Sequence, residues 1–139
     1  MVPFFLALAF AAPQPPAWIQ RAAVPPPIVA WRLADVLGAP NVEGIAVDRD
    51  AAFDALTVSV VDSRFDPPEI VRKRDLKGGR VRWLRAGTRD GLFRIQIAVD
   101  VVDHGQETAY LLRVPRRGFD LELARTMRGQ GLSPGVFSR

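Results

Sequence analysis

The sequence predicts an all-β protein built as a sandwich of antiparallel strands, and two observations predict it. From Leu92 to Val101, apolar and polar residues alternate almost without a break, which is the period-two pattern of a strand with one buried face. Across residues 28–115, short apolar runs are separated by turns that contain Gly, Pro or Asp. Such folds carry function in loops and surfaces more often than in a catalytic cleft.

About seven strands are expected between residues 28 and 115. Their ranges are 28–33, 42–47, 56–61, a short element at 70–71, 81–86, 92–102 and 107–114. Gly44 is expected to mark a β-bulge in the second strand. In the last turn, 102–106, His104 is expected to be a simple turn residue and Gly105 to take a positive φ. This number and spacing of strands is typical of an immunoglobulin-like antiparallel β-sandwich.

The core is expected on one face of the last hairpin. Alternate residues of the two long strands share that face, so we expect them to be buried together. They are Phe93, Ile95, Ile97 and Val99 on one strand, and Tyr110, Leu112 and Val114 on the other.

The composition excludes several kinds of site. The chain has 139 residues, enough for one domain with appendages, and is 48% hydrophobic and 24% charged. It contains no cysteine and one histidine, which excludes disulfides, cysteine-ligated zinc and a thiol nucleophile. Asp62, Ser63 and Asp66 lie close together, but the Pro-Pro pair after them favours a turn over a catalytic or Ca²⁺ site. We therefore expect no enzyme activity, cofactor or metal.

Residues 1–27 form an N-terminal arm in this interpretation. The run from Val2 to Ala12 is apolar and uncharged and is too short to span a bilayer, which takes about 20 apolar residues. An assembly arm that packs on a neighbouring subunit is favoured. A signal peptide cleaved after Ala11 or Ala12 and a membrane anchor are the alternatives. The arm residues expected at an interface are Phe4, Phe5, Leu6, Leu8 and Phe10.

The rest of the arm, from Pro13 to Pro27, contains six prolines. Proline removes amide donors and favours extended backbone, so a stiff tether is expected, with Trp18 as an aromatic anchor. The boundary of the sandwich domain, 28–115, is placed after Pro27.

The C-terminal tail, 116–139, departs from the β pattern. Asp120 is suited to cap a short helix from Leu121 to Arg128 that stops at Gly129. Such a helix would dock on the sandwich or on a neighbour. The interface residues expected in the tail are Leu123, Met127 and Phe137.

The net charge is +4, and basic residues gather in one region of the sequence. Its members are Arg72, Lys73, Arg74, Lys77, Arg80, Arg82, Arg85, Arg89 and Arg94. A phosphate-binding stripe for nucleic acid is one reading. A solvated sheet face, where charges discourage edge-to-edge pairing, is the favoured one, because few aromatic residues alternate with the charges.

Three stretches of the sandwich carry a resemblance to a known class of protein. They are 30–38 (AWRLADVLG), 82–88 (RWLRAGT) and 97–114, with Asp103-His104-Gly105 in the hairpin. Together they resemble small immunoglobulin-like virion proteins of tailed phages and prophages. The resemblance implies a multi-copy structural component near the head–tail junction, the tail or the fibre attachment region. Its partners would be copies of itself and other particle subunits, and its location the virion.

Two competing functions remain open from the sequence. A small secreted or periplasmic β-sandwich with a signal peptide would serve as a binding module. A nucleic-acid-binding module would use the basic cluster and is less favoured.

Overall fold

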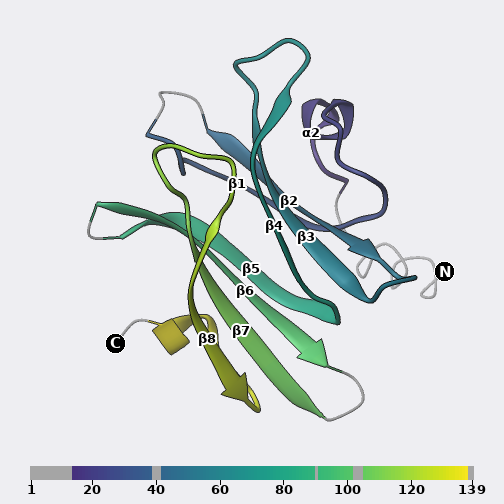
Figure 1. Cartoon of the computed structure of the whole chain (residues 1–139), viewed down its shortest axis with the longest axis vertical. Helices are drawn as coiled ribbons and strands as arrows, with labels where there is room; N and C mark the ends of the chain where they lie inside the picture. Colours follow the sequence, from purple (N-terminus) through teal and green to yellow (C-terminus); the bar gives the residue numbers. More distant parts are fainter. Residues whose placement is uncertain (1–13, 39–41, 90, 102–104, 138–139) are drawn as a thin grey trace, which may run out of the picture.

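The computed structural model describes residues 14–38, 42–89, 91–101 and 105–137 (Figure 1). Within this part of the chain, eight strands form two four-stranded antiparallel sheets. The first sheet contains β1 (Ile28–Ala34), β2 (Glu43–Asp50), β3 (Ala55–Asp62) and β4 (Glu69–Lys77). The second contains β5 (Arg80–Arg89), β6 (Leu92–Val101), β7 (Gln106–Arg113) and β8 (Glu122–Gly129). A short helix, α2 (Ala17–Arg21), precedes the sheets, and a 3-10 helix, η1 (Pro134–Phe137), follows them.

Each sheet is a meander of consecutive strands. The hydrogen-bonded orders are β1-β2-β3-β4 and β5-β6-β7-β8, and the two sheets form the two layers seen in Figure 1. The expected all-β sandwich is therefore confirmed. Immunoglobulin domains combine strands from separate parts of the chain in each sheet, so the strand order here differs from the immunoglobulin order.

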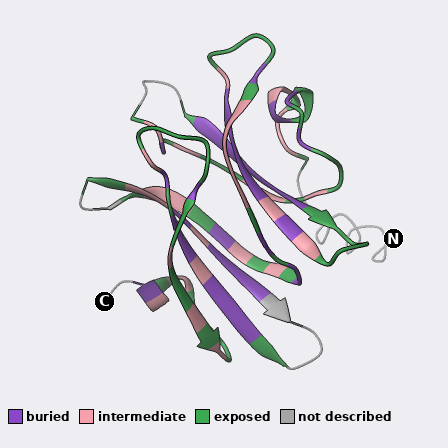
Figure 2. Ribbon diagram, viewed as in Figure 1, coloured by how far each residue is buried: buried purple, intermediate pink, exposed green. Residues whose placement is uncertain are grey.

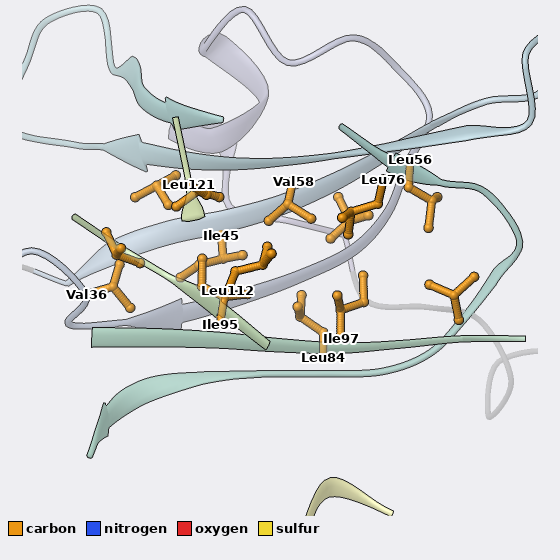
Figure 3. Packing of buried hydrophobic residues seen from close by; sticks show 14 residues of the cluster. Val36, Ile45, Leu56, Val58, Leu76, Leu84, Ile95, Ile97, Leu112 and Leu121 are labelled. Atoms are coloured by element: carbon orange, nitrogen blue, oxygen red, sulfur yellow. The ribbon is translucent and has the colours of Figure 1, made fainter. Parts of the chain in front are cut away.

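The two layers enclose one apolar core. Figure 3 shows buried side chains of both sheets meeting in the space between them, among them Ile45 and Val58 from the first sheet and Ile97 and Leu112 from the second. The expected core is confirmed: Ile95, Ile97, Val99, Leu112 and Val114 are buried, and Phe93 and Tyr110 pack against them partly buried.

The segment that leads into β8 joins the two sheets at one edge. The N–H of Lys73 in β4 donates to the carbonyl of Phe119 at 2.9 Å, and the N–H of Leu121 donates to the carbonyl of Lys73 at 3.1 Å. The side chain of Leu121 is buried in the core. At the opposite edge β1 lies beside β5 although the two belong to different sheets. The core is thus covered at both edges.

The helix expected over residues 121–128 is wrong, because Glu122–Gly129 is strand β8, paired antiparallel with β7. An isolated helix of eight residues is marginal in water. The free edge of β7, in contrast, offers a row of N–H and C=O partners to an extended chain. Asp120 accordingly lies in the bridge to Lys73.

Part of the proline-rich segment is helical, so the expectation of a wholly extended tether is wrong. Helix α2 starts directly after Pro16. Its geometry places Ile19 and, one turn later, Ala22 toward the first sheet, where both are buried. This apolar contact favours the helix over the extended form.

Two further details of the first sheet differ from expectation. Strand β4 runs from Glu69 to Lys77, much longer than the element expected at 70–71. Its charged sequence hid the strand, because Arg72, Lys73 and Arg74 do not alternate with apolar residues, although all three are half-buried along the sheet. The register is continuous at Gly44, so the expected bulge there is wrong.

We predict that Ile97→Asp unfolds the sandwich. Ile97 is fully buried, and an unpaired carboxylate at this position should cost about 4 kcal/mol or more, comparable with the whole stability of a small domain. Thermal denaturation followed by circular dichroism measures the effect. Leu92→Asp is the matched control, because Leu92 lies on the same strand and is exposed. Equal melting curves for Ile97→Asp and the wild type would contradict the core assignment.

We predict that Gly105→Val destabilises the protein by about 1 kcal/mol or more. Gly105 has φ +60°, as expected from the sequence, and precedes β7; residues 102–104, including His104, lie outside the described residues. A β-branched side chain is strained at this φ, whereas Asn tolerates it. Chemical denaturation should therefore rank the wild type above Gly105→Asn, and Gly105→Asn above Gly105→Val. The reverse order of the two variants is the contradicting result.

Candidate functional site

The outer face of the first sheet is a seat for the N-terminal segment. Ile19, Ala22 and Val24 are buried there against Ala46 of β2 and Val61 of β3. In Figure 2, α2 shows buried and exposed positions on its two sides. The contact is apolar, so residues 18–24 are held on the sheet by side-chain packing.

Gly44 makes this seat deep enough for the helix. A Cβ atom at Gly44 would lie 2.7 Å from Ile19 Cδ1 and 2.9 Å from Trp18 Cη2. A side chain on Gly44 would therefore force the Ile19 and Trp18 side chains to shift. Gly44 is required for close approach between helix and strand, a role that glycine takes in strands as well as marking bulges.

The outer face of the second sheet is a seat for the C-terminal segment. Phe137 of η1 is buried against Ala98 and Ala109, the facing pair of β6 and β7. Small residues in the centre of the sheet make room for the aromatic ring, as Gly44 and Ala46 do for α2 on the first sheet. Arg125 of β8 lies over the Phe137 ring, 5.6 Å from its centroid.

Polar contacts fix the chain between β8 and η1. The indole Nε1–H of Trp83 donates to the carbonyl of Leu132 at 2.9 Å. The N–H of Leu132 donates to Oε2 of Glu107 at 2.7 Å, and Arg82 pairs with the same carboxylate at 3.3 Å. Both the backbone N–H and the backbone carbonyl of Leu132 are thus hydrogen-bonded to side chains of the second sheet.

These contacts decide where the sequence-predicted interface residues lie. Trp18, Met127 and Phe137 pack within the chain, Trp18 as part of α2 on the first sheet and the other two on the second sheet. Leu123 on β8 is 40% exposed. The remaining arm residues Phe4, Phe5, Leu6, Leu8 and Phe10 lie outside the described residues.

Three aromatic side chains that the sequence interpretation missed are exposed on loops. Phe53 follows β2 and is 81% exposed, Phe65 follows β3, and Phe119 precedes β8. Each is followed by an aspartate in an otherwise polar or turn-forming stretch. An aromatic residue in such a stretch is the signal that would have found them, because exposed aromatic side chains are enriched at interaction surfaces.

Arginines of the basic cluster, among them Arg72, Arg74 and Arg82, hold other parts of the described chain through their guanidinium groups. The guanidinium of Arg72 donates to the carbonyls of Pro115 at 3.1 Å and Arg116 at 3.0 Å. Arg74 donates to the carbonyl of Leu121 at 3.1 Å. These bonds clamp the crossing segment, 115–121, onto β4. The side chain of Arg89 lies outside the described residues.

The residues Asp62, Ser63 and Asp66 lie at a turn after β3, as the sequence predicts. Asp62 is almost fully buried, and Arg64 holds both of its carboxylate oxygens, with Nη2 at 2.7 Å and Nε at 3.1 Å. The hydrogen bonds from Arg64 lower the pKa of Asp62. Asp62 is therefore an ionised anchor for the loop after β3.

Glu43 is a second buried carboxylate, at the start of β2. Its Oε1 accepts hydrogen bonds from the N–H groups of Val36 and Leu37, both at 2.9 Å, while Oε2 is buried without a partner. Burial raises the pKa of Glu43, although the two amide bonds oppose the shift. Glu43 anchors the loop after β1 as Asp62 anchors the loop after β3.

The two anchored loops form part of a cavity of about 560 Å³ at one end of the sandwich. Phe65 and Phe93 supply apolar lining, Arg72 and Arg116 supply positive charge, and Arg64 lines the cavity together with Asp62, its ion-pair partner. Such a mixture suits a ligand or peptide that carries both an apolar and an acidic group. Among the described residues there is no group of three or more His, Asp or Glu side chains placed to hold a metal ion.

Comparison with protein-family models, curated proteins and solved structures finds no match for this chain. No helix within the described residues is long and apolar enough to cross a membrane.

We predict that Glu43→Gln makes stability less dependent on pH. Because the pKa of Glu43 is raised on folding, its contribution to stability is complete below its unfolded pKa and is lost as pH rises through the folded value. The amide keeps an oxygen for Val36 and Leu37 and cannot ionise.

The free energy of unfolding of Glu43→Gln should therefore rise relative to that of the wild type as the pH rises from 4 to 7. Urea denaturation at several pH values gives the difference between variant and wild type. Asp62→Asn is the control with opposite sign at lower pH: the pKa of Asp62 is lowered from its usual 3.8, so its contribution to stability is present above that value and is lost as the pH falls through the folded pKa. A constant difference between Glu43→Gln and the wild type would contradict the assignment.

Proposed function

We propose that this chain is a non-enzymatic structural subunit of a phage-type particle, in the tail, the head–tail connection or a fibre adaptor. It assembles in multiple copies through its terminal segments. One observation carries the proposal: the N-terminal and C-terminal segments lie on the outer faces of the two different sheets. Each layer thus holds one terminal segment of the chain on its outer face.

The sequence of the arm supports assembly. Residues 2–12 lie four residues before α2 in the sequence and contain five large apolar side chains with no charge. Fully burying one such side chain is worth about 1.5–3 kcal/mol, so an arm that finds an apolar surface on a neighbour gains enough to offset its ordering. Helix α2, which follows this arm in the sequence, lies on the outer face of the first sheet.

The exposed loop aromatics support contacts with neighbours on other sides. Phe53 lies in the β2–β3 turn, whereas Phe65 lies in the loop after β3. A subunit with apolar groups on several sides is suited to contact more than one neighbour at once.

The resemblance to immunoglobulin-like virion proteins belongs to the same proposal. The two-layer architecture supports it, and the meander order of the strands shows that the likeness is not one of strand order. No catalytic step, cofactor or metal is part of the proposal. The candidate acids support this, because Asp62 is held by Arg64 and Glu43 by two backbone N–H groups.

A small secreted or periplasmic binding module is the alternative function. The cavity of about 560 Å³ lined by Phe65, Phe93 and arginines favours it, since it combines apolar walls with charge. In that case the mature chain starts after Ala11 or Ala12, and the arm plays no part in assembly.

We predict that deleting residues 2–12 leaves the sandwich folded and abolishes assembly. The described apolar clusters involve residues from 18 onward, so melting should change little. Sedimentation velocity of the full chain and of the truncated chain measures assembly. A variant with Phe4, Phe5 and Phe10 replaced by Ser is the matched control that keeps the length of the arm. Undiminished assembly by both variants contradicts the proposed role of the arm. Mass spectrometry that finds residues 1–12 removed from the natural product favours the alternative.

A further inference from the structure

A smaller cavity lies on the outer face of the second sheet, next to the seat of η1. Its volume is about 290 Å³. Side chains of β5 and β6 form its floor and Pro134 one wall. The residues that carry the inference are Arg85, Gly87, Arg94 and Gln96.

Two polar atoms at this cavity are buried without a hydrogen-bond partner. They are Nε of Arg94, which is a donor, and Oε1 of Gln96, which is an acceptor, so an anion could satisfy only the first. A buried guanidinium N–H without an acceptor costs free energy, and such groups call for a structural or functional explanation. Arg94 also lines the cavity, so an acceptor held there would lie near its guanidinium group.

The charges around the cavity have one sign. Arg85 and Arg94 line it, and no acidic side chain is among the described lining residues. Arg113 of β7 lies directly opposite Arg94 in the sheet, and facing like charges destabilise a strand pair. A bound anion would relieve this repulsion.

Gly87 keeps the cavity open. It pairs with Arg94 across the β5–β6 ladder, and a Cβ atom at Gly87 would meet no other atom within 4 Å. A larger residue would therefore fit there without disturbing the backbone, and its side chain would occupy space that now lies beside Arg94.

We propose that this cavity binds an oxyanion of the size of a carboxylate or phosphate group between Arg85 and Arg94. The guanidinium fork matches such anions in charge and shape. The side-chain amide of Gln96 is a further donor at the cavity. The anion is either an acidic group of a neighbouring subunit, which rests on the proposed function, or a free anion from solution.

The test follows the Nε–H signals of the arginine side chains by nuclear magnetic resonance on the full chain. Sodium acetate and sodium phosphate are titrated at constant ionic strength against sodium chloride. The Arg94 signal should shift and saturate with both oxyanions and not with chloride. Gly87→Leu, which fills the cavity and keeps both charges, should weaken binding roughly tenfold to a hundredfold, as expected when charge-assisted hydrogen bonds are lost.

Arg94→Gln, followed at Arg85, should weaken binding to a similar degree. Arg128→Gln is the control, because Arg128 is an exposed residue of β8 that does not line the cavity. Shifts that stay linear with concentration, or that are equal in Gly87→Leu and the wild type, overturn the proposal. If Arg94→Gln fails to fold, Gly87→Leu decides the outcome alone.

Assembly distinguishes the two sources of the anion. If the anion is a carboxylate of a neighbour, Gly87→Leu reduces sedimentation of the assembled form and acetate competes with assembly. If it is a free anion, the titration saturates while assembly stays unchanged in Gly87→Leu. The titration does not need assembly, so loss of the proposed function and loss of the anion site give different results.

Discussion

The junction between β4 and the crossing segment, 115–121, is the contact on which the rest of the structure depends. Strand β4 is an edge of the first sheet, and the crossing segment leads into β8, an edge of the second. Backbone bonds of Lys73 and the guanidinium groups of Arg72 and Arg74 hold the two together. Because this junction fixes where β8 starts, it also fixes where the tail returns and where Phe137 finds its seat. Polar contacts at one edge thus place apolar contacts on a distant face.

Charged side chains act mainly inside this protein as connectors. Glu43 and Asp62 each hold a loop, and Glu107 holds Leu132 while it pairs with Arg82. Each of these carboxylates has a hydrogen-bond partner close by, so its charge stabilises a local contact and contributes little to the electrostatic field around the molecule. Arg72, Arg74 and Arg82 are used in this way, and they form part of the basic cluster that, in the linear sequence, looks like a surface for nucleic acid.

The sequence predicts the parts of the fold in which local pattern and burial agree. The alternation around Ile97 correctly predicted β6 and its buried face, and Gly105 was correctly predicted to have a positive φ. It did not predict β4, whose charged residues are half-buried through their aliphatic stems, or β8, where Leu123 and Met127 fit a helix equally well by spacing. A strand at a sheet edge is decided by its neighbour, and that information is not local. The contact sites at Gly44 and Ala98 were missed for the same reason. A small residue in a strand can be interpreted only when the segment that packs on it, here α2 or η1, is known.

The placement of the two terminal segments on opposite layers has a mechanical consequence. A pulling force on the two terminal segments would act on one sheet through α2 and on the other through η1. The load would pass across the apolar core and along the bonds of Lys73, Arg72 and Arg74 in parallel. Such a subunit would resist tension because the two sheets are held together at the edge where Arg72 and Arg74 bind the crossing segment.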